Sequence, residues 1–471
     1  MLLGVDIGTS SSKGVLLSPD GAVLATATRE HRTSTPGPGW FEHDAEQVWW
    51  RDFAHIVAEL GRPGLAAVAV SGIGPCVLPA TADGTPLRPA ILYGVDTRAT
   101  EQIEAQNRRY LEILQRCGSP LTSQAVGPKL EWLREHEPDT WARTRRLFMA
   151  HSWIVHELTG AYVLDHHSAS QCAPLYEPHR WIEDWAAEIA PGLELPRLLW
   201  SGEVAGTVTA GAAARTGLPE GLPVLAGTID AWAEAHSAGV REPGDVMLMY
   251  GTTMFIVQVL ASRATSPHLW GTVGLTPGTF NLAAGTATSG AVTSWLSDLT
   301  GTGFAELTAE AAAVPPGCEG LLMLPYFAGE RTPLFDPDAR GVLIGLTLRH
   351  GRGHLYRAAL EATAFAVRHN LEVMPAPRRL VAVGGGTRGG LWAQIVSDVL
   401  GLPQDLPAHT IGAAYGDAML AAQALGIDTG GWNPVATTIR PDPAASYDER
   451  YRLYRRLHEA TAEIAHTLAR S

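Results

Sequence analysis

The sequence predicts an α/β protein built from two related domains. Apolar stretches of strand length alternate with amphipathic helical stretches along the whole chain. The 471 residues exceed what one hydrophobic core accommodates, because domains usually hold about 100–200 residues. A strand, a Gly-Thr turn and a second strand occur near residue 8 and again near residue 251. This repeated pattern, half a chain apart, indicates an internal duplication.

Three predicted strands open the first half of the chain. Residues 1–30 read as an apolar strand, a Gly-Thr-Ser turn, a second strand, an Asp-Gly turn and a third strand. A helical stretch follows from Asp44, a favoured N-cap residue, with Gln47 three positions later in capping-box spacing. Residues 96–118 form another helical stretch, which a glycine ends. The Pro- and Gly-rich residues 31–40 are typical of a loop.

The second half repeats the strand pattern and then becomes helical. Residues 244–261 read as a strand, a Gly-Thr-Thr turn and a strand, and residues 279–287 add a third strand. Small and apolar residues on one face of the stretch 354–374 predict a helix that packs on a sheet. We therefore expect an N-terminal domain at 1–240, a C-terminal domain at 241–440 and a closing amphipathic helix at 441–471.

Bulk composition excludes several function classes. The net charge of −13 argues against wrapping nucleic acid or adhering to an anionic membrane. No apolar run reaches the ~18 residues of a membrane span, and the chain starts directly in a strand without a signal peptide. The four cysteines are scattered, which favours free buried thiols over disulfides or a zinc site. These observations predict a cytoplasmic protein.

Asp6 is the first candidate functional residue. It lies at the end of an apolar strand, where a carboxylate is costly unless it meets a cation or hydrogen-bond donors. It could simply cap its own turn. However, Gly8, Thr9, Ser10 and Lys13 follow it and supply backbone N–H groups, hydroxyls and a cation. This combination suits a phosphate chain with bound Mg²⁺, although no Walker A motif is present.

Asp230 is the second candidate. An apolar strand ends in Gly-Thr just before it, and a helix could begin at it. The alternative is a simple N-cap, because Asp is a favoured capping residue. The C-terminal end of a strand is nevertheless where α/β folds place catalytic groups.

The stretch "VAVGGGTRGGLW", residues 381–392, presents a glycine turn between a strand and a helix. Gly384, Gly386 and Gly389 satisfy the spacing of a dinucleotide-binding turn, with Asp405 about 20 residues on. In a dinucleotide fold the acidic residue ends the next strand, whereas Asp405 lies between prolines. We therefore interpret the turn as a loop at a helix start that lets another nucleotide approach the backbone.

The stretch "GVLIGLTLRHGRGHLYRAALE", Gly341 to Glu361, resembles the second signature of the FGGY carbohydrate kinases. The resemblance covers nearly the whole chain: "GVDIGTSSSKG" is similar to the first phosphate loop of the family, "YGTT" to its second hairpin and "GGGTRGGLWAQIVSD" to its adenosine loop. It implies an actin-like ATPase fold of two duplicated ribonuclease-H-like domains, with ATP in the central cleft.

The resemblance also implies roles for individual residues. Asp6 would position Mg²⁺, and Asp230 falls on the catalytic base of the family. The remaining nucleotide contacts would come from Thr9, Ser10 and Lys13 at the phosphates, Gly251 and Thr252 from the other domain, and Gly385 and Gly386 under adenosine.

Within the family, "GWFEHDAEQVWW" and "YFAGERTPLFDPDARG" look most like xylulokinases, but the sugar pocket departs from them. Gly74 and Pro75 stand where xylulokinases carry Met-His. Directly after Asp230, where those enzymes often have Asn, this chain has Ala231 and Trp232. Trp232 could stack on a sugar face or pack between domains. Asp96 and Arg98 match an Asp-x-Arg element near the sugar, with a salt-bridged helix start as the alternative.

The function expected from these residues is an ATP-dependent kinase of a ketopentose, with xylulose first. Alternatives are ribulose, a deoxy-ketose, a tetritol or glycerol, although the Gln-Arg-Glu segment of glycerol kinases is absent from residues 71–79. An actin-like nucleotide switch without catalysis is a different class, and it would lack the FGGY signature. The expected partners are the sugar or polyol and MgATP, and a homodimer is a further expectation.

Overall fold

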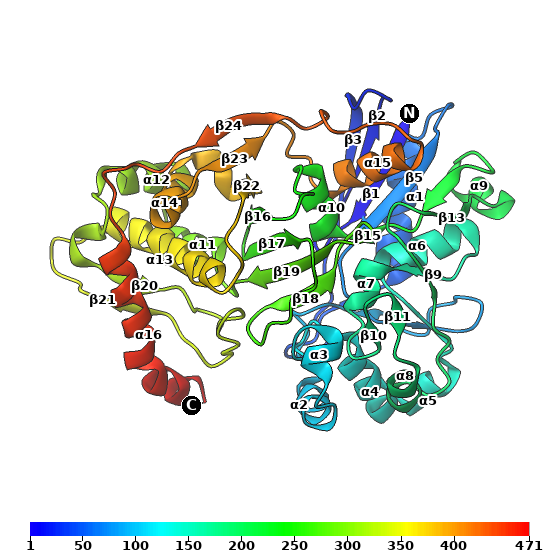
Figure 1. Cartoon of the computed structure of the whole chain (residues 1–471), viewed down its shortest axis with the longest axis horizontal. Coiled ribbons are helices and arrows are strands. Elements are labelled where there is room, and N and C mark those ends of the chain that lie inside the picture. Colours follow the sequence, from blue (N-terminus) through cyan, green and yellow to red (C-terminus); the bar gives the residue numbers. More distant parts are fainter. Residues whose placement is uncertain (471) are drawn as a thin grey trace.

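Two mixed β-sheets organise the computed structural model, which describes residues 1–470 (Figure 1). The first sheet has the strand order β13-β14-β5-β1-β2-β3, and β15 pairs with β5. The second has the order β18-β19-β17-β16-β22-β23-β24. The strands of the first sheet are β1 (Leu2–Ile7), β2 (Ser11–Leu17), β3 (Val23–Glu30), β5 (Ala67–Gly72), β13 (Val204–Thr207), β14 (Pro223–Leu225) and β15 (Thr228–Ile229). Those of the second are β16 (Asp245–Tyr250), β17 (Met254–Leu260), β18 (Trp270–Val273), β19 (Phe280–Gly285), β22 (Arg379–Val383), β23 (Gln404–Pro407) and β24 (Val435–Ile439).

The two sheets share one core arrangement. In the first, β1 is antiparallel to β2 and parallel to β5, which follows a helix. In the second, β16 is antiparallel to β17 and parallel to β22, which also follows a helix. The central strands β1 and β16 are apolar and covered on both faces, as their near-continuous hydrophobic sequences predict. The duplication expected from the repeated turn sequence is therefore present in the fold.

Helices cover both sheets, and five short strand pairs form separate small sheets. The helices of the first half are α1 (Arg51–Leu60), α2 (Thr100–Arg109), α3 (Ile113–Cys117), α4 (Val126–His136), α5 (Pro138–Arg143), α6 (Ala150–Thr159), α7 (His166–Ser170), α8 (Glu183–Ile189), α9 (Ala210–Thr216) and α10 (Asp230–Ser237). Those of the second half are α11 (Gly290–Thr300), α12 (Phe304–Ala313), α13 (Arg352–Glu372), α14 (Leu391–Leu400), α15 (Ala413–Ala424) and α16 (Asp448–Ala469). The short pairs are β4 (Glu42–His43) with β7 (Ala90–Ile91), β6 (Leu78–Ala80) with β8 (Arg146–Phe148), β9 (Val163–Asp165) with β12 (Arg197–Leu199), β10 (Tyr176–Glu177) with β11 (Arg180–Trp181), and β20 (Leu322–Leu324) with β21 (Val342–Ile344).

One helix crosses between the two halves of the molecule. α15 lies in sequence between β23 and β24 of the second sheet but packs against β1 and β5 of the first sheet and against α10, which Figure 1 shows beside it. Two glycines allow this close approach. A Cβ atom on Gly4 would lie 2.0 Å from the carbonyl oxygen of Ala414, and one on Gly416 would lie 1.9 Å from that of Ala233. Side chains on β1 alternate between faces, so Asp6 points to the α15 face while Val5 and Ile7 point into the other core.

The predicted helical stretches form, with two differences. Asp44 accepts a hydrogen bond from the backbone N–H of Gln47 (2.8 Å) as expected, but a π-helical turn, Ala45–Trp50, precedes α1. The stretch 96–118 divides into α2 and α3, and Tyr110 at the break packs against Trp185 with 4.7 Å between ring centroids. Gly118 ends α3 in a left-handed conformation (φ 95°), where glycine carries no steric penalty.

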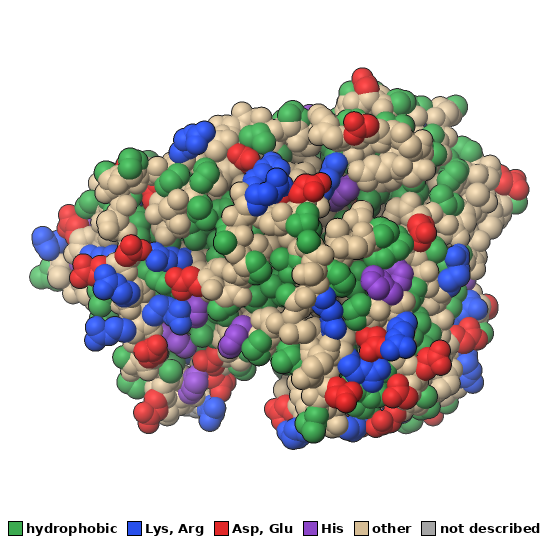
Figure 2. Space-filling model, in the orientation of Figure 1, with side chains coloured by type: hydrophobic (Ala, Val, Ile, Leu, Met, Phe, Trp, Pro, Cys, Tyr) green, Lys and Arg blue, Asp and Glu red, His purple; other side chains and the backbone are tan. Residues whose placement is uncertain are grey.

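The surface carries charges of both signs, and the molecule is notched between its two halves. Figure 2 shows basic and acidic side chains gathered over α2, α4 and α8, and a second mixed group near α16. The four cysteines are free thiols, as their scattered positions predicted. Within residues 1–470, no helix combines the length and apolarity that crossing a membrane requires.

Candidate active site

The turn between β1 and β2 forms one wall of the candidate site. The backbone N–H of Gly8 donates to the carbonyl of Ser11 (3.1 Å), and a Cβ atom on Gly8 would lie only 2.6 Å from that oxygen. The hydroxyl of Thr9 lies 3.3 Å from the hydroxyl of Tyr93, while the side chains of Ser10 and Lys13 are exposed. The turn thus requires glycine and presents two hydroxyls and a cation to solvent.

Asp6 lies directly below this turn. Its Oδ1 atom is buried and makes no hydrogen bond within the described residues. Burial raises the pKa of Asp6 from 3.8 to about 6, although the charge of Lys13 and a hydrogen bond from Ser71 oppose the shift. An unpaired carboxylate oxygen of this kind is costly unless a cation or donor meets it.

Asp230 lies at the junction of β15 and α10, where the sequence placed it. Its Oδ1 atom accepts a hydrogen bond from the backbone N–H of Ala231 (2.7 Å). Burial, and then the negative charge of Asp6, raise the pKa of Asp230 well above its ordinary value. The charge of Asp6 can raise the pKa of Asp230 only if the two carboxylates, distant in sequence, lie near each other in the fold.

Two further acidic residues join this region. Glu234 follows Asp230 by one helical turn on α10, and burial together with Asp6 raises its pKa to about 7. Asp417 on α15 is fully buried, and its Oδ2 atom accepts hydrogen bonds from the backbone N–H (3.0 Å) and hydroxyl (2.6 Å) of Ser71. Burial raises the pKa of Asp417, and the charges of Asp6 and Asp230 add to the shift. The four-residue spacing on a helix could have signalled Glu234.

The acidic groups fit a Mg²⁺ ion that arrives with a nucleotide. No set of three or more His, Cys, Asp or Glu side chains within residues 1–470 is arranged to hold a metal by itself. Mg²⁺ is commonly bound by one or two carboxylates together with substrate phosphates and water. We call the β1–β2 turn at residues 8–10 the phosphate-type turn. The unpaired Oδ1 of Asp6, beside this turn, is the oxygen that such an ion would use.

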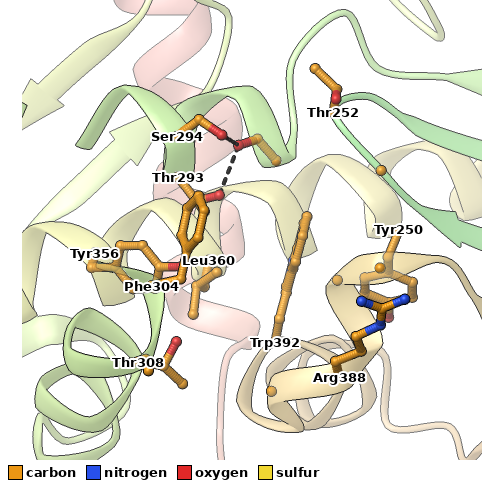
Figure 3. A pocket seen from close by; sticks show the side chains of 16 residues that line it. Tyr250, Thr252, Thr293, Ser294, Phe304, Thr308, Tyr356, Leu360, Arg388 and Trp392 are labelled. Atoms are coloured by element: carbon orange, nitrogen blue, oxygen red, sulfur yellow. Dashed lines mark hydrogen bonds between the residues drawn. The ribbon is translucent and has the colours of Figure 1, made fainter. Parts of the chain in front are cut away.

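A cavity of about 580 Å³ lies in the second half of the molecule (Figure 3). Its walls come from the β16–β17 turn, α11, α12, α13 and the glycine turn after β22, and the predicted Gly251, Thr252, Gly385 and Gly386 all line it. The side chains of Thr9, Ser10 and Lys13 do not contribute to this wall. Aromatic and aliphatic side chains surround the interior, which suits a flat heterocycle: Phe304, Tyr356, Leu360 and Trp392.

The glycine turn floors this cavity and is not a dinucleotide site. Gly386 packs so closely on Trp392 that a Cβ atom would lie 2.6 Å from the indole, whereas Gly385 has open space above it. Asp405 does lie in a strand, β23, contrary to expectation. However, its carboxylate is already bound by Arg379 (2.8 Å) and the hydroxyl of Thr438 (2.7 Å), so it is not free to bind a ribose.

A second cavity, of about 170 Å³, adjoins Asp230. The expected Gly74, Pro75 and Trp232 line it together with Asp230. Four polar side chains complete the wall: Tyr93, Gln124, Gln171 and Arg331. Sequence reasoning missed the first three, because they come from segments far apart in the chain. The aromatic rings of Phe255 and Trp270 also line the cavity. Hydroxyl-binding groups and flat apolar faces together suit a sugar or polyol.

Trp232 lies both at the cavity and between the two halves of the molecule. Its ring lines the smaller cavity and also packs on His167 (4.0 Å between centroids) and on Phe255 of the second sheet (5.5 Å). It therefore joins the two halves at the cavity wall.

Asp96 and Arg98 do not line the cavity. Arg98 donates to both carboxylate oxygens of Asp96 and to Glu42 (2.8 Å), and its guanidinium lies over Trp40, so the structure favours an ion pair. Arg331, in contrast, does line the cavity. It makes no side-chain ion pair with Glu330 in the described structure; its guanidinium lies over Trp270 at the cavity, 4.8 Å from the ring centroid.

Comparison with known proteins identifies the family. The models for the N-terminal and C-terminal domains of the FGGY family of carbohydrate kinases match residues 1–235 and 246–425. The chain belongs to the FGGY family of carbohydrate kinases. FGGY kinases are ATP-dependent phosphotransferases, and Mg²⁺ is their usual partner metal.

Relatives of this FGGY kinase carry two different names. A glycerol kinase from Nocardia farcinica is 32% identical over 473 residues (91% of this chain and 90% of the relative). A xylulose kinase from Escherichia coli is 29% identical over 485 residues (98% and 99%). The crystal structure of xylulose kinase from Rhodospirillum rubrum has a TM-score of 0.91 and 34% identity over 99% of both chains. The expected two-domain, actin-like kinase fold is thereby confirmed.

Proposed function

We propose that this FGGY kinase transfers the γ-phosphoryl group of MgATP to a primary hydroxyl of a ketopentose, with xylulose as the first candidate. The observation that carries the proposal is the position of Asp230. Its carboxylate lines the 170 Å³ cavity and also interacts electrostatically with Asp6 below the phosphate-type turn. It therefore stands where an acceptor hydroxyl and the end of a triphosphate would meet.

In this proposal Asp230 orients the acceptor hydroxyl and accepts its proton. Phosphoryl transfer has a loose transition state, so positioning and charge neutralisation matter more than a strong base. Burial and the charge of Asp6 raise the pKa of Asp230, which makes its carboxylate a stronger base than an ordinary aspartate. Asp6 would hold Mg²⁺, which supplies charge neutralisation at the phosphates, and Lys13 would add a second positive charge.

The nucleotide would bridge the two halves. Its adenosine would occupy the larger cavity above Gly385 and Gly386, with Gly251 and Thr252 approaching the phosphates from the second sheet. Thr9 and Ser10 would approach them from the first sheet. Closing the cleft would bring these turns together and exclude water, which limits wasteful hydrolysis of ATP.

Two observations support a ketopentose over glycerol. Residues 71–79 contribute only Gly74 and Pro75 to the cavity wall and contain no Gln-Arg-Glu segment. The solved xylulose kinase from Rhodospirillum rubrum matches the whole chain at 34% identity. Glycerol remains the second candidate, because glycerol kinases are among the relatives of highest identity in sequence (31–32%).

An ATP-consumption screen across pentuloses, hexuloses, tetritols and glycerol tests the proposal. We expect the highest kcat/KM with xylulose, with the Asp230→Asn variant as the inactive control. A clear preference for glycerol would replace the substrate while keeping the mechanism. Absence of turnover with every acceptor, in wild-type protein that binds MgATP, would contradict the assignment.

A further inference from the structure

We propose that His31 is held as an imidazolium behind the phosphate-type turn and is a positioning residue for the triphosphate of ATP. This inference rests on the assignment of the β1–β2 turn to the phosphates proposed above. None of the family motifs found in the sequence includes His31, which follows the last residue of β3.

Three consecutive carbonyl groups of the turn are bound from behind. The Nε2 atom of His31 lies 3.1 Å from the oxygen of Gly8, and the backbone N–H of His31 donates to the oxygen of Ser10 (3.0 Å). Between them, the hydroxyl of Thr33 donates to the oxygen of Thr9 (3.0 Å). Carbonyl oxygens repel phosphate oxygens, whereas clustered N–H groups attract them. Binding all three carbonyls from one side keeps them turned away from the ligand.

The partners of His31 fix its charge. Its Nδ1 atom lies 2.7 Å from Oδ2 of Asp52, and both side chains are only 1% exposed. Asp52 also accepts hydrogen bonds from Arg51 and from the hydroxyl of Ser12 (3.1 Å), and these bonds together with His31 hold its pKa below its ordinary value despite burial. An ionised carboxylate and a backbone carbonyl can only accept hydrogen bonds. Both ring nitrogens of His31 must therefore donate, which requires the doubly protonated ring.

His43 provides an internal contrast. Its ring contacts His31 edge-on, with 5.0 Å between centroids, but its Nδ1 atom accepts a hydrogen bond from the indole N–H of Trp49 (3.1 Å). Burial, and then the charge of His31, lower the pKa of His43 to about 4. His43 is thus neutral, and its Nε2–H can donate to the hydroxyl of Thr33 (3.1 Å). One buried histidine of the pair carries charge and the other does not.

The positive charge of His31 lies behind the β1–β2 turn, where it would attract the phosphates bound in front of the turn. The charged groups around His31 are Asp52 and Arg51 at the start of α1, and Asp6 and Lys13 on β1 and β2. The charge of His31 favours the ionised form of Asp6, as does that of Lys13. Lys13 would act from the solvent side and His31 from the protein side of the same turn.

The protonation state is tested by NMR on protein labelled with ¹⁵N-histidine, with His31→Gln and His43→Gln used for assignment. We expect both ring nitrogens of His31 to resonate as an imidazolium at pH 7.5 and those of His43 to show a neutral ring. A neutral ring at His31 in the wild-type protein would overturn the inference. This result does not depend on any acceptor or on kinase activity.

The positioning role is tested by nucleotide binding. We expect His31→Phe to weaken binding of a non-hydrolysable ATP analogue about tenfold or more, because a charged hydrogen bond is lost, while adenosine binding stays unchanged. His31→Gln keeps one hydrogen-bond donor, so its affinity for the ATP analogue should lie between those of His31→Phe and wild type. It provides a second measurement if His31→Phe folds poorly. The exposed His55→Gln on the same helix as Asp52 is the matched control. Equal weakening of adenosine and the ATP analogue, or no weakening of either, would overturn the role.

Discussion

β1 and β16 occupy the same place in their sheets, each between a hairpin partner and a parallel strand, but they differ at one register position. The fifth residue of β1 is Asp6, which pairs with Lys13 on β2 and with Ser71 on β5. A carboxylate, a cation and a hydroxyl therefore meet at the end of the first hairpin.

The corresponding position of the second hairpin is apolar. The fifth residue of β16 is Met249, which pairs with Phe255 on β17 and with Val383 on β22. Met249 and Phe255 form part of the wall of the smaller cavity instead. The comparison teaches that duplication supplied two equivalent scaffolds. The side chains at one register position are polar and charged in the first copy, to which we assign the chemistry, and apolar and part of a cavity wall in the second.

The largest effect is expected from Asp230, the proposed catalytic base. Asp230→Ala should fold and bind ATP but lose more than about a thousandfold in kcat, because a positioned catalytic group is removed. Steady-state kinetics with calorimetric titration of ATP measures both quantities. Retention of a tenth of wild-type turnover would remove Asp230 from the mechanism.

Single substitutions at the two matched register positions, Asp6 on β1 and Met249 on β16, test the comparison itself. Asp6→Asn should lower kcat/KM for MgATP about a hundredfold, since an amide cannot neutralise the metal. Met249→Leu, at the same position of β16, should change it less than about threefold, because volume-conserving apolar exchanges are well tolerated. Comparable losses in both variants would mean that the register position matters for folding and not for chemistry.

Lys13 should have a smaller effect. Lys13→Ala is expected to raise the KM for MgATP about tenfold, the value of one lost charged hydrogen bond to a phosphate. Lys13→Arg should recover most of the loss. Unchanged kinetic constants in Lys13→Ala would make this lysine a surface residue only.

The smallest effect concerns stability and pH. Glu234 has a pKa raised from 4.5 to about 7, so the folded protein holds its proton more tightly than the unfolded chain does. The contribution of Glu234 to stability therefore falls as pH rises from 4.5 to about 7. Without nucleotide or Mg²⁺, Glu234→Gln should gain a few degrees in Tm over wild type across this window and then level off. Exposed Glu220→Gln is the control, and a difference that is constant with pH would contradict the buried, raised pKa.

Most of the predictions that the sequence allowed came from local motifs, in which the residues concerned are neighbours in the chain. Both hairpin turns, Asp6, Asp230 and the glycine turn at 384–390 depend on residues adjacent in the chain, and their spacing was sufficient. Asp417 could not be interpreted, because its partner Ser71 lies 346 residues away on another sheet. The place of Arg331 could not be predicted for the same reason: only the assembled fold brings it to the cavity of Asp230.

A crystal structure with Mg²⁺ and a non-hydrolysable ATP analogue tests the central claim most directly. We expect adenine above Gly385 and Gly386, the terminal phosphates between the turn after Asp6 and the turn at Gly251, and the metal on Asp6. A nucleotide bound elsewhere, or a metal without contact to Asp6, would contradict the assignment of chemistry to the first copy of the duplicated hairpin.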